Sequence, residues 1–136
     1  MVLNINYSEI QDIIKQKVNK DIKLSPVDSQ TICVSIDISL PLIGKKEVRV
    51  QLKLEVINNQ YALLSYSNGL GVDLVITAIL KYLEMQSNVS YVQGLPDNRI
   101  KIQLNQIPQA QSALKAIELQ ALVFTNSCAE IEFALK

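Results

Sequence analysis

The chain has 136 residues, of which 49% are apolar and 19% are charged, and its 13 basic residues balance its 13 acidic ones. A disordered chain needs few apolar residues and a charge imbalance, so this composition excludes intrinsic disorder. A protein held on nucleic acid by phosphate contacts needs surplus positive charge, so we expect no nucleic-acid partner. The length favours a single domain, residues 1–136.

Residue types on which much enzyme chemistry depends are missing. The chain has no His, which removes the usual general base near neutral pH and the commonest transition-metal ligand. Its two cysteines, Cys33 and Cys128, are far apart and lack a Cys-x-x-Cys companion, so they indicate small buried hydrophobes rather than a zinc site. We therefore expect a non-enzymatic protein without catalytic residues, metal or cofactor.

Neither a targeting segment nor a membrane span is predicted. Met1 to Asn6 shows no basic stretch followed by an apolar run, so we expect no signal peptide and a cytoplasmic protein. The longest apolar stretch, Leu70 to Leu83, contains Asp73 and Lys81 and is shorter than the ~20 residues that cross a bilayer.

The first predicted element is an amphipathic helix over Ser8–Lys20, with Ser8 as the N-cap and Gln11 completing a capping box. Strict alternation of apolar and polar residues then predicts two long strands, Thr31–Leu40 and Val48–Ile57. Each is half buried, which favours an antiparallel sheet with one wet face.

A turn at Asn58-Asn59 leads into a third predicted strand, Tyr61–Ser67, because Asn tolerates positive φ. That register places Leu54 opposite Leu63. It also pairs Val56 with Tyr61 and Leu52 with Ser65.

The segment Val72–Met85 predicts a helix that is apolar over most of its circumference, because its polar residues fall on one narrow stripe. Gly69 and Gly71 precede it, but the further motif residues of a phosphate loop are missing and Asp73 would repel a phosphate. We interpret the glycines as a strand-to-helix turn.

The C-terminal half predicts further short elements: strands Val89–Gln93 and Arg99–Leu104, a helix Ile107–Ala116, and a hairpin of Ile117–Thr125 with Cys128–Leu135. In this hairpin Leu122 faces Ile131 and Phe124 faces Ala129. Glu130 and Glu132 share the opposite face, which we interpret as a solvated strand face rather than an acid/base pair.

This order of elements predicts an α+β fold in which a long, curled antiparallel sheet wraps around the apolar helix 72–85, with an N-terminal amphipathic helix beside it. A flat sheet would cover only one side of such a helix, so a curled sheet, a ligand, a membrane or a second subunit must cover the rest.

The connection Leu40 to Lys46 joins the two longest strands. Its apolar residues Leu42 and Ile43 and its basic residues Lys45 and Lys46 suit contact with an anionic membrane surface. The simpler alternative is that Leu42 and Ile43 fold back and plug the end of the core.

The pattern resembles that of tubular lipid-binding (TULIP-type) modules and related small bacterial domains. The resemblance rests on SIDISLPLIGKKEVRVQLKLEV, on YSNGLGVDLVITAIL, and on NRIKIQLNQIP leading into IELQALVF, and it spans Leu24 to Leu135. It implies a twisted antiparallel sheet around a helix, with an apolar groove for acyl chains.

The leading hypothesis is therefore that the chain binds a lipid or another apolar ligand between sheet and helix. The expected lining residues are Leu74, Val75, Ile79, Tyr82 and Leu83 on the helix and Leu52, Leu54 and Leu63 on the sheet. The alternative is a protein-interaction or homo-oligomeric module, such as a homodimer, whose apolar surface a partner covers. Zero net charge favours association.

Overall fold

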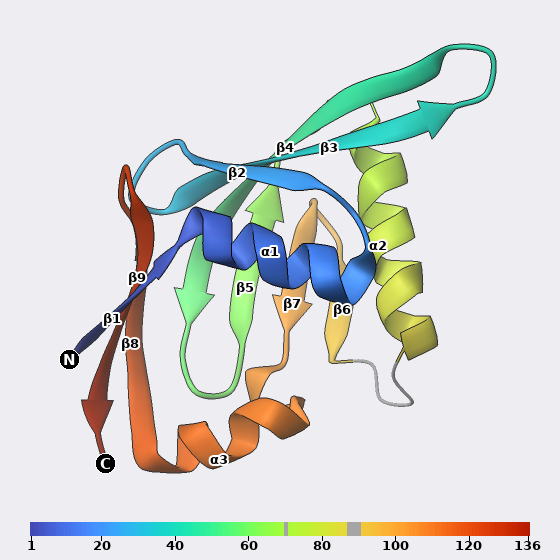
Figure 1. The fold of residues 1–136 in the computed structure, drawn as a ribbon. Coiled ribbons are helices and arrows are strands. Elements are labelled where there is room, and N and C mark those ends of the chain that lie inside the picture. The colour runs from blue at the N-terminus through green and yellow to red at the C-terminus, as the bar shows by residue number, and fades with distance from the viewer. Residues whose placement is uncertain (70, 87–90) are drawn as a thin grey trace.

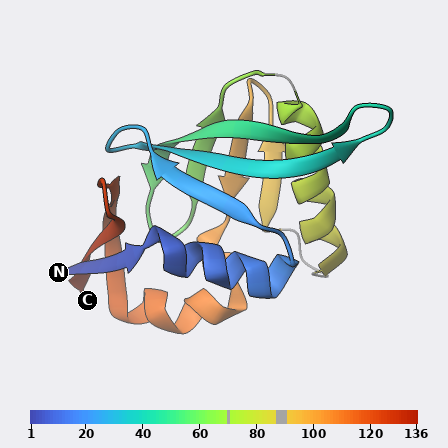
Figure 2. The same ribbon diagram turned by 45° about the horizontal axis from the view of Figure 1, so that its top comes forward.

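The computed structural model describes the backbone of residues 1–69, 71–86 and 91–136, together with their side chains except those of residues 17, 18, 40, 79, 82–86 and 109. Within these residues nine strands form two antiparallel sheets, and three α-helices pack around them (Figures 1 and 2). The predicted α+β class with antiparallel sheets is confirmed.

The small sheet has the order β1-β9-β8 and the large sheet the order β2-β3-β4-β5-β7-β6. The strands are β1 (Val2–Asn6), β2 (Ile22–Pro26), β3 (Thr31–Leu40), β4 (Gly44–Ile57), β5 (Ala62–Tyr66), β6 (Val92–Leu95), β7 (Arg99–Ile102), β8 (Ile117–Phe124) and β9 (Cys128–Leu135). The helices are α1 (Tyr7–Val18), α2 (Val72–Gln86) and α3 (Pro108–Ala116), and a 3-10 turn spans Leu104–Gln106.

One face of the large sheet carries the core, and α1 and α2 both lie on that side (Figure 1). The strongest burial is in β4, where Val48 and Val50 pack against Val72 and Val75 of α2. Near α1 and the small sheet, a second cluster forms around Tyr7, Ile32 and Ala129, joined by Leu122 and Phe124. On the opposite face the polar side chains of β4 are exposed, as the period-two pattern predicted.

The predicted curled sheet around a central helix is wrong, since neither sheet is closed or strongly curled. The hairpin β8–β9 pairs with β1 in a sheet of its own instead of continuing the large one. Part of the apolar surface that a single sheet would have left exposed is instead buried where the two sheets and α1 meet, in the second cluster. The outer side of α2 stays uncovered, with Asp73, Leu74 and Thr77 exposed.

The N-terminal prediction missed two strands and misplaced the helix cap. Because β1 leads directly into α1, the N-cap is Asn6, without a side-chain hydrogen bond, and Ser8 lies inside the first turn. Gln11 has another role than in a capping box: its side-chain oxygen accepts the Leu24 N–H of β2 at 2.9 Å. The helix ends at Val18, one residue before Asn19 in the left-handed conformation.

The predicted register between β4 and β5 is also wrong, because a β-bulge lies between Leu54 and Val56. Leu54 is opposite Leu64, and Leu63 is opposite Val56. Since directly opposite residues share a face, Leu63 lies on the other side of the sheet from Leu54. The other predicted pairs of these two strands shift as well, so that Leu52 lies opposite Tyr66 rather than Ser65.

The C-terminal elements agree more closely with the sequence. The pairs Leu122–Ile131 and Phe124–Ala129 of the β8–β9 hairpin are confirmed, and Pro108 stands in the first turn of α3. The strand predicted at Val89–Gln93 begins within residues 87–90, which lie outside the described part; β6 starts at Val92. β7 ends at Ile102, two residues earlier than predicted.

Candidate functional site

The β3–β4 hairpin is the longest among the described residues, and it projects beyond the helices at one end of the molecule (Figure 1). Leu40 and Gly44 form its last pair, and residues 41–43 make the turn. Leu42 has a φ of 71° and Gly44 a φ of 88°. A left-handed conformation suits Gly but costs a bulky L-residue about 1–2 kcal/mol.

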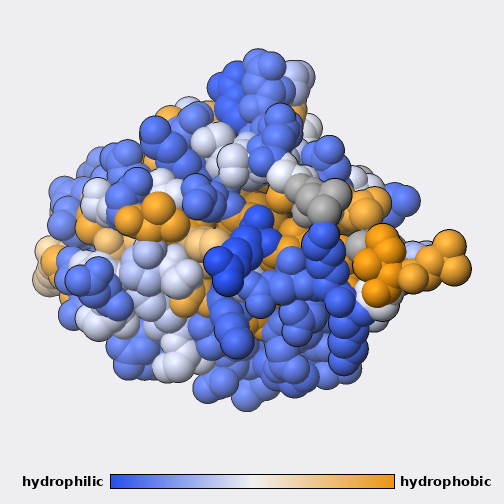
Figure 3. Space-filling model, turned by 90° about the horizontal axis from the view of Figure 1, so that it is seen from above, coloured by the Kyte–Doolittle hydropathy of each residue, from blue (hydrophilic) through white to orange (hydrophobic). Residues whose placement is uncertain are grey.

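The side chains at this hairpin tip point into solvent. Leu42 is fully exposed and Ile43 is 71% exposed, so the alternative that they plug the core is wrong. Figure 3 shows hydrophobic atoms projecting at the end of the molecule where the hairpin lies. Leu42 therefore contributes nothing to the core, although its left-handed conformation costs free energy.

Charge at the tip is positive. Lys45 and Lys46 follow the turn, and neither has an ion-pair partner within the described part of the chain. The next residue, Glu47, accepts a hydrogen bond from Arg49 Nε at 2.7 Å. This bond and the nearby guanidinium lower the pKa of Glu47, so that its charge is engaged within the hairpin stem. The four residues predicted to contact a membrane, Leu42, Ile43, Lys45 and Lys46, are thus brought together.

Among the described residues predicted to line an apolar groove, Val75 and Leu52 share one core cluster, and the others do not join them there. Leu54 is buried in β4 outside that cluster, and Leu74 is 60% exposed on the outer side of α2. Leu63 lies on the other face of the sheet. The side chains of the remaining three, Ile79, Tyr82 and Leu83, are outside the described residues.

The described part of α2 packs directly on the sheet. A Cβ atom added to Gly94 of β6 would lie 3.2 Å from Leu80 Cδ1, and one added to Gly71 would lie 2.9 Å from Val48 Cγ2. Contacts this close leave no space for an acyl chain beneath these turns of the helix.

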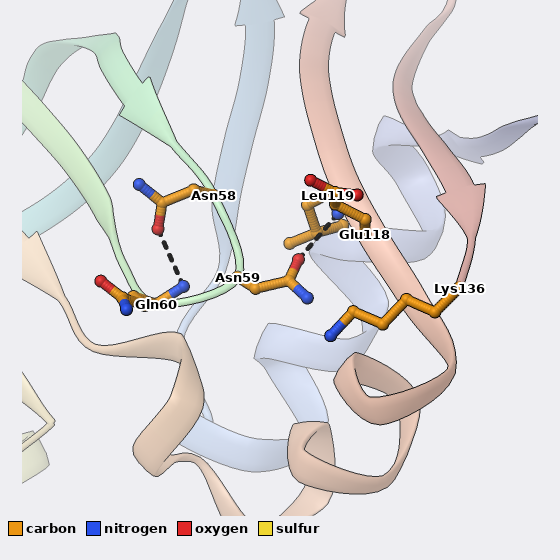
Figure 4. A pocket seen from close by; sticks show the side chains of 6 residues that line it. All are labelled: Asn58, Asn59, Gln60, Glu118, Leu119 and Lys136. Atoms are coloured by element: carbon orange, nitrogen blue, oxygen red, sulfur yellow. Dashed lines mark hydrogen bonds between the residues drawn. The ribbon is translucent and has the colours of Figure 1, made fainter.

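A different hollow, lined mainly by polar residues, lies at the junction of the two sheets. It has a volume of about 290 Å³, and Figure 4 shows its lining: Asn58, Asn59, Gln60, Glu118, Leu119 and Lys136. A neighbouring hollow of about 360 Å³ shares Asn59, Gln60 and Lys136. The sequence indicated only a turn here, because the partners of the turn are distant along the chain.

Asn59 spans this junction with three hydrogen bonds. Its Nδ2 donates to the carbonyl of Ile117 at 2.9 Å and to that of Leu114 at 3.2 Å, and its Oδ1 accepts the Leu119 N–H at 2.7 Å. All hydrogen-bonding capacity of its side chain except one acceptor site is therefore used within the fold. The hollow consequently has a structural explanation, and we assign no ligand to it.

No identification of the chain comes from similarity. Family models, curated proteins and solved structures give no match to it. The resemblance to tubular lipid-binding modules therefore finds no support in these comparisons. Among the described residues no three His, Cys, Asp or Glu side chains gather into a metal-binding group, and no described helix is long and apolar enough to cross a membrane.

Proposed function

We propose that this chain is a non-enzymatic module that docks reversibly on an anionic lipid surface through its β3–β4 hairpin tip. The observation that carries the proposal is the full exposure of Leu42, in the left-handed conformation, at the end of a projecting hairpin. Ile43 beside it and the two lysines after it supply the apolar and electrostatic parts of such a contact.

The magnitudes fit weak peripheral binding. Burial of each large aliphatic side chain contributes about 1.5–3 kcal/mol. Each lysine near an anionic surface adds about 1 kcal/mol. These few contributions favour reversible association, whose strength depends on lipid charge and on salt.

The proposal is tested by co-sedimentation with vesicles of phosphatidylcholine alone and with vesicles that contain phosphatidylserine. The double variant Leu42→Ser, Ile43→Ser is expected to weaken binding at least tenfold, since it removes most of the apolar contribution. The matched control is Leu74→Ser, because Leu74 is an exposed leucine (60%) outside the hairpin. It should bind like the parent chain.

A second pair of variants separates charge from apolar contact. Lys45→Gln with Lys46→Gln should remove most of the preference for phosphatidylserine and flatten the salt dependence. Equal binding by all variants, or equal binding to both kinds of vesicle, would contradict docking by the tip.

Surface docking also predicts that no lipid is carried inside the protein. Native mass spectrometry of the purified chain should give the mass of the bare polypeptide or of an oligomer of it. The physical reason is the direct packing of Val72, Val75 and Ile76 on the sheet. A stoichiometric fatty acid or phospholipid in the organic extract would instead support the groove between sheet and α2 and count against the tip as the sole lipid contact.

A further inference from the structure

Strand β1 forms an open edge of the small sheet. Met1 N donates to the Phe133 carbonyl at 2.8 Å, and Phe133 N donates to the Met1 carbonyl at 2.9 Å. In an antiparallel ladder every second residue forms such a doubly bonded pair. Leu3 and Ile5, opposite Ile131 and Ala129, are therefore the next ones. The N–H and C=O groups of Val2 and Asn4 point away from β9.

This edge lacks the usual protection. Natural edge strands carry charges, proline or bulges, or are covered, whereas β1 has the sequence Val-Leu-Asn-Ile-Asn and pairs without a bulge. Within the described residues no further backbone bond reaches Val2 or Asn4. Their outward groups are thus free for another strand.

Two other edges show the contrast. In β2 the Leu24 N–H is taken by the Gln11 side chain, and Pro26 has no N–H. In β8 the Leu119 N–H is taken by Asn59 and the Phe124 N–H by the Ser29 carbonyl. The fold thus supplies partners to those outward groups, whereas no described residue supplies one to the outward groups of Val2 and Asn4.

Exposed apolar side chains concentrate at the same edge. Val2 is 55% and Leu3 is 51% exposed, and Leu135 at the end of β9 is also exposed. Figure 2 places β1 and the end of β9 at one side of the molecule. A strand that adds to this edge would cover apolar surface and satisfy four backbone groups at once.

The geometry points to a second copy of this chain as that strand, with β1 pairing antiparallel to β1 across a two-fold axis. The carbonyl of an N-cap residue accepts the first hydrogen bond of its helix, so the Asn6 carbonyl is used by α1 and is not available to another strand. Val2 and Asn4 then remain as the residues with both groups free. Pairing Val2 with Asn4 of the second copy, and the reverse, uses all four groups in each chain and places Leu3 on the axis.

The pairing is self-complementary, as a two-fold interface requires. Leu3 faces Leu3 of the second copy as a non-hydrogen-bonded pair, in which opposite Cβ atoms are about 4.5–5.5 Å apart. No side chain of β1 is charged, and the whole chain has zero net charge. The two small sheets join into one continuous sheet.

Sedimentation equilibrium over a range of concentrations tests the inference. The parent chain should rise from 15.2 kDa towards twice that mass. Asn4→Pro removes only an outward N–H and should be monomeric, whereas the matched control Asn4→Ala keeps the N–H and should dimerise. Circular dichroism checks that both variants are folded.

A pair of oppositely charged variants at Leu3 tests the register of the β1–β1 pairing without a proline substitution. Leu3→Lys alone and Leu3→Glu alone should each be monomeric, because like charges face each other across the axis. An equal mixture of the two should form a heterodimer that weakens with salt. A parent chain that stays at 15.2 kDa, an Asn4→Pro dimer as strong as that of Asn4→Ala, or a mixture without heterodimer overturns the inference. If the parent chain stays monomeric, the β1 edge would instead suit pairing with an extended segment of another protein.

Discussion

Asn59→Asp is expected to lower the free energy of unfolding by about 3 kcal/mol, although the two side chains have the same shape. The carboxylate keeps the bond from the Leu119 N–H but turns an oxygen towards the carbonyls of Ile117 and Leu114, where Asn59 donates two hydrogen bonds. Each lost bond costs about 1 kcal/mol, and the unpaired, mutually repelling oxygens add to this cost.

The sign of the pH dependence follows from the same contacts. Two carbonyl oxygens disfavour the charged form, so the new carboxyl has a raised pKa in the folded state. The folded state therefore binds more protons than the unfolded state between the two pKa values. The loss of stability should be complete above the folded pKa and should diminish as the pH falls through it. Urea unfolding at several pH values measures this.

Asn58→Asp is the matched control for that experiment. Asn58 Oδ1 accepts the N–H groups of Gln60 and Tyr61 at 2.8 and 2.9 Å, and a carboxylate can accept both. Its stability should stay within about 0.5 kcal/mol of the parent, as for a surface change. Equal losses of stability in both variants would show that any negative charge in this turn destabilises the fold. The hydrogen bonds of Asn59 to Leu114, Ile117 and Leu119 would then not be the cause.

Gly71→Ala is expected to cost about 2–5 kcal/mol, from two separate sources. Gly71 has a φ of 80°, which costs an L-residue about 1–2 kcal/mol. The added Cβ would also stand 2.9 Å from Val48 Cγ2, and Val48 is buried in the core and cannot yield freely. Overpacking of this kind typically costs 1–3 kcal/mol. Thermal unfolding should show a decrease of roughly 10 °C.

Gly44 supplies the control that separates these two sources. Its φ is 88°, but an added Cβ would meet nothing within 4 Å. Gly44→Ala should therefore cost only the backbone contribution of about 1–2 kcal/mol. A Gly71→Ala variant no less stable than Gly44→Ala would mean that α2 does not pack on β4 as closely as described.

The sequence predicted the long strands and their faces well, because a half-buried strand needs period-two alternation over its whole length. Thr31–Leu40 is confirmed as β3, with Ile32 in the core. The predicted β8–β9 pairs Leu122–Ile131 and Phe124–Ala129 are likewise confirmed, because the short gap between the two predicted strands leaves room only for a tight turn. The start of α2 at Val72 followed from the glycines before it.

Other features depend on contacts that no local pattern contains. The short strand β1 exists because β9, more than a hundred residues away, lies beside it. Because Glu55 is an extra residue in a β-bulge, Leu63 lies on the other face of the sheet from Leu54, and the predicted pair of these two residues does not form. The helix cap shifted from Ser8 to Asn6 for a similar reason, since β1 runs directly into α1.

The hairpin tip, too, could be predicted from the sequence only in part. Its composition, two apolar and two basic residues between two long strands, was visible in the sequence. Whether Leu42 and Ile43 plug the core or face solvent was not, because both arrangements satisfy the same pattern. The class of fold, the longest strands and the lack of His chemistry follow from composition and periodicity alone. Which apolar residues remain uncovered and which sheet edges stay open depends on the folded arrangement, since burial is a property of how distant segments meet.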